Sequence, residues 1–170
     1  MKTARHDSAA AERLAWASAA CQERGLRRTA AREKILGFLA RHDHPVTLAT
    51  VTGDPGVAET CDPATVFRVL QKLEEAGLAR RIWLHERTPF YVLVTPHGHR
   101  DYVLCTQCGR VEATGLDCPV QALEKEVGAR LGYAGLRHEL GFYGLCPDCQ
   151  GAAGKAGTKP RKAARARTCC

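Results

Sequence analysis

The sequence has no long apolar segment. No apolar run among its 170 residues approaches the roughly 18 residues needed to cross a bilayer. Residues 1–25, MKTARHDSAAAERLAWASAACQERG, lack the apolar core of a secretory signal and carry acidic side chains. Hydrophobic residues make up 45% and charged residues 25% of the chain, a balance typical of globular proteins. We therefore expect a cytosolic protein.

Acidic residues are absent from the last twenty residues, GAAGKAGTKPRKAARARTCC, which carry six Lys/Arg. Residues 1–96 have a net charge of +3 and residues 97–150 of −2, so this tail supplies most of the formal net charge of +7. Such a composition cannot bury a core, and we expect residues 151–170 to be a disordered basic tail. The tail either touches DNA phosphates non-specifically or only solubilises the chain.

Nine cysteines are the second notable feature. In a reducing compartment paired thiols are metal ligands or redox groups more often than disulfides. Four form two CxxC pairs, Cys105 with Cys108 and Cys146 with Cys149. The remainder are unpaired by spacing, and we assign them no functional role: Cys21, Cys61, Cys118, Cys169 and Cys170.

The first half of the chain has helical periodicity. We expect helices over residues 8–23 and from Thr29 onward, and a weaker one over LATVT, 48–52. The clearest helix follows Asp62 and Pro63, which suit an N-cap and a first helical position. Its apolar stripe points inward, whereas the opposite face carries side chains that reach phosphates and base edges: Thr65, Phe67, Arg68, Gln71 and Lys72.

Two β-like runs, LARRIWLH (78–85) and PFYVLV (89–94), follow this helix and predict a hairpin. Helices followed by a hairpin predict a winged helix-turn-helix DNA-binding domain over residues 1–94, in which Thr29 and Arg32 of the second helix also contact DNA. Residues 95–150 are predicted to form a small α/β domain, with strands over 100–105, 109–114 and 134–146 and a helix over 118–132. A unit this small has edges to cover, so pairing with a second copy is plausible.

The two CxxC pairs suit one tetrahedral zinc ion held by four thiolates. Each pair offers two sulfurs from a tight turn, and the segment 109–145 lets the two turns close on one ion. In so small a domain the metal would contribute directly to folding. The rival interpretation is a rubredoxin-like iron centre, but aromatic residues are only 6% of the chain and a full helix separates the pairs.

Histidines form a second group of candidate ligands. On an extended strand His97, His99 and Asp101 alternate onto one face, and His138 precedes Cys146 by eight residues. Imidazole with carboxylate suits Fe(II), Zn(II), Mn(II) or Ni(II) and permits exchange more readily than four thiolates. The alternative is a set of exposed polar residues. His85, His42 and His44 are more typical of plain surface.

At this point the residues resemble the Fur (ferric uptake regulator) family of bacterial metalloregulators over roughly residues 12–150. The matching stretches are RGLRRTAAREKILGFL, HPVT, PATVFRVLQKLEEAGLARR, YVL, HGHRDYVLCTQCGRVE and GFYGLCPDC. The resemblance implies an α+β protein with an N-terminal winged helix, a C-terminal dimerisation domain with a four-cysteine zinc site, and repression when a regulatory metal binds near the hinge.

Carried over by position, the four paired cysteines match the structural zinc ligands. His99, Asp101 and His138 match regulatory ligands, with His97, His85 and His44 as supplements. The sequence also departs from the family. Phe67 replaces a usual tyrosine, Val92 a common hinge glutamate and Tyr102 a histidine of the metal cluster, which argues against a second full regulatory site. Gln121 lies near an expected ligand carboxylate, which Glu124 could replace.

We therefore predict a homodimeric, metal-dependent repressor that carries structural Zn(II) and is not an enzyme. The predicted sensor has no evident thiolate, which mildly favours Fe(II) over Zn(II) or Mn(II) as the regulatory ion. A peroxide sensor, in which bound iron oxidises a ligand histidine, is a further variant. The alternative of another class is a redox protein or metalloenzyme with a CxxC-pair site, which would leave the basic helix and hairpin unexplained.

Overall fold

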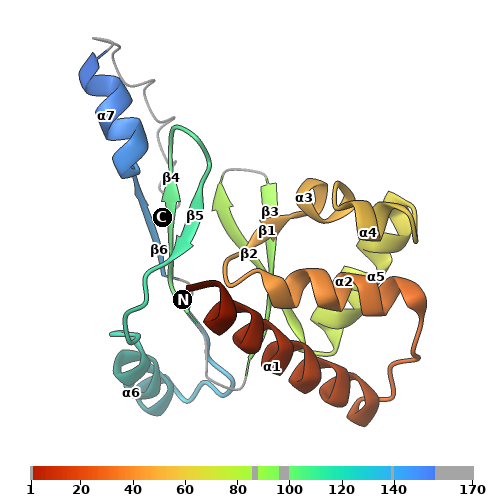
Figure 1. The fold of residues 1–170 in the computed structure, drawn as a ribbon. Helices are drawn as coiled ribbons and strands as arrows, with labels where there is room; N and C mark the ends of the chain where they lie inside the picture. Colours follow the sequence, from red (N-terminus) through yellow and green to blue (C-terminus); the bar gives the residue numbers. More distant parts are fainter. Residues whose placement is uncertain (1, 86–87, 96–99, 139, 156–170) are drawn as a thin grey trace.

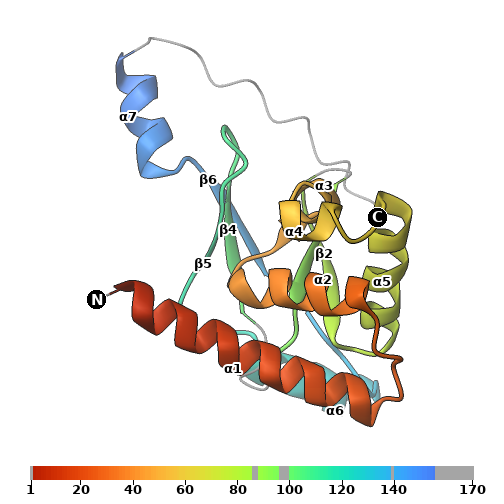
Figure 2. The same ribbon diagram turned by 45° about the vertical axis from the view of Figure 1, so that its right-hand side comes forward.

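The computed structural model describes residues 2–85, 88–95, 100–138 and 140–155. A group of helices lies on one side of the molecule, two small sheets lie in the middle and at the other side, and the last helix projects beyond them (Figures 1 and 2). Among the described residues, no helix is both long and apolar enough to cross a membrane.

The N-terminal half is helical as expected, and each helix has a local cause. Its helices are α1 (Lys2–Glu23), α2 (Ala30–Arg41), α3 (Leu48–Thr52), α4 (Pro55–Ala58) and α5 (Pro63–Glu75). Asp62 caps α5 by accepting a hydrogen bond from the Thr65 backbone N–H, and Pro63 occupies the first turn. Val66, Leu70 and Leu73 of α5 are buried, so the predicted stripe does face the core. The short helix α4 was not predicted.

The first sheet has the order β1-β3-β2. It contains β1 (Val46–Thr47), β2 (Ala79–His85) and β3 (Thr88–Leu93), all antiparallel to their neighbours. Strands β2 and β3 are the predicted hairpin, whereas β1 was not anticipated. Along β3 the side chains alternate: Tyr91 and Leu93 join the core beneath the helices, and Phe90 and Val92 face the other way.

The second sheet has the order β5-β4-β6 and leaves β6 at an edge. It contains β4 (Tyr102–Cys105), β5 (Val111–Ala113) and β6 (Gly141–Gly144), with β6 parallel to β4. Tyr102, Leu104 and Val111 pack against residues of β2 and β3 in a second core. The first sheet therefore lies between the helices and the second sheet, and both of its faces are covered.

Two helices complete the chain, α6 (Gln121–Leu131) and α7 (Pro147–Lys155). Several predicted boundaries need correction. Helix α1 begins at Lys2 and not at residue 8. Helix α6 begins at Gln121 and not at residue 118, and only Gly141–Gly144 of the predicted strand 134–146 forms a strand. Residues 151–155 continue α7, so the prediction of a disordered tail was wrong for them. The rest of that prediction, on 156–170, lies outside the described residues, as do Cys169 and Cys170.

Candidate metal centres and nucleic-acid interface

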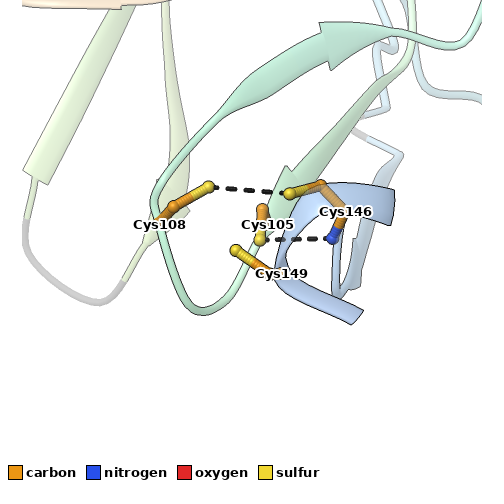
Figure 3. A group of neighbouring side chains, drawn as sticks. All are labelled: Cys105, Cys108, Cys146 and Cys149. Carbon is orange, nitrogen blue, oxygen red and sulfur yellow. Dashed lines mark hydrogen bonds between the residues drawn. The ribbon is translucent and has the colours of Figure 1, made fainter. Parts of the chain in front are cut away.

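The four paired cysteines converge on one point although they come from distant parts of the chain (Figure 3). Cys105 ends β4, Cys108 lies in the turn after it, Cys146 directly precedes α7, and Cys149 lies in its first turns. All four sulfurs lie within 4.8 Å of one another. Cys108 Sγ and Cys146 Sγ are 3.8 Å apart. This spacing fits a tetrahedral zinc ion bound by four thiolates.

Hydrogen bonds and an ion pair hold the two turns together around this four-cysteine cluster. The Thr106 backbone N–H donates to the Gly144 carbonyl at 2.8 Å, which joins the β4 turn to the end of β6. Arg110 donates to the Asp148 carboxylate at 2.6 Å, which joins the same turn to α7. Gly109 has a φ of +74°, a conformation that favours glycine, which explains why glycine follows the first CxxC pair. The cluster is thus shaped by the fold around it.

The environment of the thiols favours a bound cation. Backbone N–H groups, those of Cys108 and Cys146 first, lower the pKa of Cys105 to about 6. A hydrogen bond with the Cys146 sulfur, together with burial and the other sulfurs, raises the pKa of Cys149 to about 12. One thiol therefore ionises easily, and the last resists ionisation because the sulfurs crowd together. A divalent cation would offset this repulsion, as zinc does when it binds thiolates.

A second group of candidate ligands lies near the N-terminal end of β4, whereas the cysteine turn follows its C-terminal end. Asp101 precedes β4, Cys118 precedes α6 and His138 follows α6, and their donor atoms all lie within 4.8 Å of one another. Cys118 Sγ is 3.0 Å from His138 Nε2. On the other side of the ring, His138 Nδ1 is 2.9 Å from a carboxylate oxygen of Glu124. The structure therefore brings together Asp101, His138 and Glu124, as predicted, and adds Cys118.

Cys118 is the residue that sequence reasoning missed. It belongs to no CxxC pair and lies 20 residues before His138, so no short spacing marks it. One signal was present. Gln121 stands where the family resemblance implies a ligand carboxylate, and Cys118 is a strong donor only three residues earlier. The predicted ligands His97 and His99 lie outside the described residues, and so does the side chain of His85.

His44 does not join this second group among the described residues. It lies in the loop between α2 and β1, where its Nδ1 is 3.1 Å from the Asp43 carboxylate. A nearby cavity of about 190 Å³ is lined by two of the residues that depart from the family, Val92 and Tyr102. Its charged lining residues are Arg13, Arg80, Arg100 and Asp43. Three guanidinium groups oppose the binding of a cation in this cavity.

Helix α5 presents the predicted polar face to solvent. Phe67, Arg68, Gln71 and Lys72 are exposed, and Thr65 is half-buried. The Thr65 hydroxyl donates to the Asp62 carboxylate at 2.8 Å, so it also serves the N-cap. Backbone and hydroxyl hydrogen bonds from Thr65 lower the pKa of Asp62. Side chains of this length on an exposed helix can enter a major groove.

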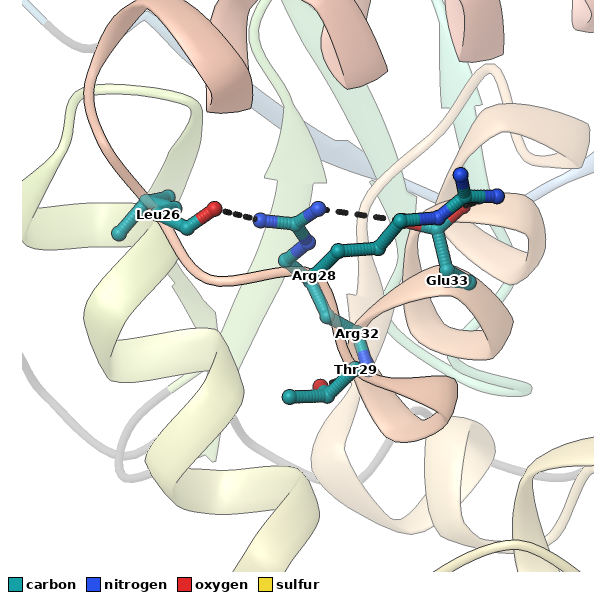
Figure 4. A network of polar contacts seen from close by, with 5 residues as sticks. All are labelled: Leu26, Arg28, Thr29, Arg32 and Glu33. Atoms are coloured by element: carbon teal, nitrogen blue, oxygen red, sulfur yellow. Dashed lines mark hydrogen bonds and ion pairs between the residues drawn. The ribbon is translucent and has the colours of Figure 1, made fainter.

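The two α2 residues predicted to contact DNA have structural roles (Figure 4). Thr29 is the N-cap and accepts a hydrogen bond from the Arg32 backbone N–H. Arg32 is 5% exposed, and its guanidinium donates to the Leu26 carbonyl and to Glu33. A DNA contact by Arg32 was the wrong prediction, because its side chain holds the α1–α2 connection from inside. Arg28 beside it is exposed instead.

Comparison with known proteins agrees with this architecture. A sequence model of the Ferric uptake regulator family matches residues 23–143. The ferric uptake regulation protein of Legionella pneumophila is 32% identical over 131 residues, which cover 76% of this chain and 95% of that protein. The iron-containing ferric uptake regulator of Francisella tularensis is 26% identical with a TM-score of 0.60, covering 74% of this chain and 96% of that one. A zinc uptake regulator in complex with zinc and DNA is 26% identical with a TM-score of 0.61, covering 85% and 97%.

Proposed function

The chain belongs to the ferric uptake regulator family, and from that premise we propose that it is a homodimeric transcriptional repressor that binds operator DNA when a regulatory metal ion is bound. Such a protein works where the DNA is, in the cytoplasm, and catalyses no reaction. One observation carries the proposal: an exposed polar helix face and two separate groups of metal ligands occur in the same small molecule. A metalloenzyme would have no use for that helix face.

The DNA-binding face in this proposal is α5, inserted into the major groove, with β2 and β3 as the wing. Val66, Leu70 and Leu73 hold α5 against the core, so its opposite side is free for DNA. Of the exposed residues, Gln71 suits base edges and Lys72 suits phosphates.

The dimer in this proposal forms through the second sheet and α6. Strand β6 lies at the edge of its sheet, and an unpaired edge is available to a second copy. Helix α6 buries none of its residues in the single chain, and large apolar side chains lie exposed there and on β6: Leu123, Leu131, Phe142 and Tyr143. A soluble protein normally covers such a set against a partner.

The metals have separate roles in this proposal. The four-cysteine cluster holds a zinc ion that stabilises the second sheet and α7. The group around His138 holds the exchangeable ion, whose binding favours the DNA-competent arrangement of the two halves. The relatives named ferric uptake regulation proteins favour Fe(II) as that ion. The preference for Fe(II) drawn from the sequence, however, assumed a sensor without a thiolate, and Cys118 removes that assumption.

Metal-dependent DNA binding tests the proposal directly. Duplexes are selected from a random library with protein and Zn(II), or Fe(II) without oxygen, and the affinity for the selected duplex is then measured by fluorescence anisotropy. A chelator that removes only the exchangeable ion should lower the affinity by roughly 5- to 150-fold, the usual range for coupled sites. If no ion enriches any duplex, the protein is not a metal-dependent DNA-binding regulator.

Variants on two helices localise the binding face. Lys72→Ala should lower the salt dependence of log K by about one unit of slope, and Gln71→Ala should relax discrimination at one base pair by about 1–3 kcal/mol. Lys125→Ala removes the same charge from an exposed position on α6 and, at protein concentrations where the variant is fully dimeric, should change neither. Equal effects at Lys72 and Lys125 would show that α5 is not the contact.

A further inference from the structure

Three different donor atoms meet between β4 and α6. The Asp101 carboxylate, the Cys118 sulfur and His138 Nε2 come from three separate segments, and all lie within 4.8 Å of one another. The distance of 3.0 Å between the sulfur and Nε2 is short enough for one ion to touch both after a small outward shift. An oxygen, a sulfur and a nitrogen donor thus face one small volume.

Glu124 fixes which nitrogen of His138 faces that volume. An ionised carboxylate only accepts hydrogen bonds, so His138 Nδ1 must carry the proton that it donates to Glu124 across 2.9 Å. The lone pair of the neutral ring then lies on Nε2, on the side of Cys118. A carboxylate behind a ligating histidine is the usual arrangement at zinc sites. Glu124 therefore acts as a positioning residue, and the earlier assignment of Glu124 as a ligand changes.

We propose that Cys118 is a ligand of the regulatory ion and that its sulfur makes this site, formed by Asp101, Cys118 and His138, selective for Zn(II) over Fe(II). The inference rests on the proposed function, because it names the ion that the repressor senses. Thiolate sulfur favours zinc-class ions, whereas iron(II) sensing suits sites of nitrogen and oxygen donors. One sulfur in place of a carboxylate oxygen increases the ratio of the Zn(II) affinity to the Fe(II) affinity.

The surroundings fit a site that exchanges its ion. The side chains of His138 and Glu124 are 16% and 22% exposed, so solvent reaches the histidine side of the site, whereas Asp101 is buried. Cys118 and His138 lie in the loops that flank α6, where they can adjust to an ion. Binding of an ion through a cysteine thiolate releases the thiol proton, so occupancy of this site would be accompanied by proton release. The four-cysteine cluster, by contrast, has four thiolates and suits permanent occupancy.

The position of Asp101 connects the metal site to the DNA-binding half of the molecule. Asp101 directly precedes β4, and the next residue, Tyr102, packs with Ile82 and Phe90 of the wing strands. An ion that joins Asp101 to the loops around α6 therefore restrains the base of the wing. Binding at this site can shift the two halves toward one arrangement without touching DNA.

Cobalt(II) tests the sulfur ligand by absorption. The full-length protein is first loaded with zinc at the four-cysteine cluster and then titrated with Co(II). Because zinc fills the four thiolates, a thiolate-to-cobalt charge-transfer band in the near ultraviolet can come only from another cysteine. The wild-type protein should show this band for one equivalent of Co(II), and Cys118→Ser should lose it, whereas Cys61→Ser should keep it. A wild-type protein without the band overturns the proposal.

Competition between Zn(II) and Fe(II) tests the selectivity. Zinc binds more tightly than iron at most sites, so the informative quantity is the change in the affinity ratio when sulfur is replaced. Cys118→Asp keeps a three-ligand set with oxygen in place of sulfur, and its preference for Zn(II) should fall by about tenfold or more. Glu124→Gln should weaken both ions by about 10- to 100-fold without changing the Co(II) spectrum. An unchanged ratio in Cys118→Asp would contradict the assignment.

The readouts separate this inference from the proposed function. If Co(II) shows the sulfur band but no ion promotes DNA binding, the site assignment holds and the repressor function fails. If DNA binding is metal-dependent in the wild type and unchanged in Cys118→Ser, the repressor function holds and Cys118 is not a ligand.

Discussion

At the scale of single residues, Arg32 shows that a sequence pattern does not distinguish an arginine that contacts DNA phosphates from one that stabilises the fold. It follows the exposed arginines Arg27 and Arg28, and three basic residues at the start of a helix are typical of a phosphate-binding segment. Its side chain nevertheless turns inward, where it satisfies the Leu26 carbonyl and pairs with Glu33. The Leu26 carbonyl lies within the α1–α2 connection and needs a donor there, because a buried acceptor without one is costly.

Substitution of Arg32 and Arg28 should therefore have opposite effects. Arg32→Ala leaves the Leu26 carbonyl without its donor and should lower the free energy of unfolding by about 1–3 kcal/mol. Arg28 is 75% exposed, so Arg28→Ala should change stability by no more than about 0.5 kcal/mol. In DNA binding, Arg28→Ala should reduce the salt slope and Arg32→Ala should not. Urea denaturation and salt-dependent anisotropy of the folded proteins measure both; a normal stability for Arg32→Ala would contradict the structural role.

The same scale shows why part of the site could be predicted and part could not. Cys105, Cys108, Cys146 and Cys149 are visible in the sequence because each tight turn needs two sulfurs at short spacing. The partnership of Cys118 with His138 depends on how the loops around α6 fold back, and no local pattern records that. Ligands that are close in the sequence can be predicted from their spacing, whereas ligands that meet only through the tertiary fold cannot.

At the scale of elements, α5 and α6 show where capping patterns succeed and where they fail. Asp62 and Pro63 begin α5 where their types predict, because the Asp62 carboxylate accepts from the Thr65 backbone N–H and Pro63 fits the first turn. Asp117 and Pro119 are residues of the same types just before α6, but the helix begins at Gln121 without a side-chain cap. The Val120 backbone N–H donates to the Cys118 sulfur instead, and that turn directs Cys118 toward His138. A tertiary contact overrides the local preference.

The strand prediction over 134–146 failed for a related reason. His138 is bound to Glu124 of α6, so the chain before it follows the helix and cannot join the sheet. Gly132 and Gly135 have φ values of +75° and +65°, which turn the chain back after α6. Only Gly141–Gly144 then pairs with β4. For β2, β3 and β4 the alternation of residue types in the sequence was sufficient to predict a strand.

Loss of one zinc ligand should release the joined ends of β4 and α7. Cys105→Ser removes the most buried of the four sulfurs, and the protein should contain roughly one metal ion fewer. Amide hydrogen exchange in β4, β6 and α7 should become faster, whereas α2 and α5 should stay protected because their core is separate. Elemental analysis and exchange mass spectrometry measure the two effects. Cys61→Ser is the matched control, and unchanged metal content in Cys105→Ser would rule out the structural zinc.

At the scale of the whole molecule, the two halves differ in how well they cover their apolar surface. The core beneath α1–α5 is enclosed, with Ile35, Leu36 and Leu70 fully buried. The second half has a small core that it shares with the wing strands and leaves much of α6 and β6 uncovered. A metal ion and a partner subunit would supply what so small a sheet lacks. The first half therefore has a core of its own, whereas the second half would depend on a metal ion and a partner subunit for its stability.

A charged residue on β6 should therefore separate the subunits without unfolding them. Phe142 is 43% exposed in the single chain and lies on the edge strand, so Phe142→Glu would place a charge in the proposed interface. The dissociation constant of the zinc-loaded dimer, measured by sedimentation equilibrium, should rise on the order of tenfold or more. Trp83→Glu is the matched control, because Trp83 is 54% exposed on β2 of the wing and should leave the dimer intact. Equal dissociation of both variants, or of neither, would place the interface elsewhere. Since one subunit then contacts only half an operator, DNA affinity should fall together with dimerisation in Phe142→Glu, even though α5 is unchanged.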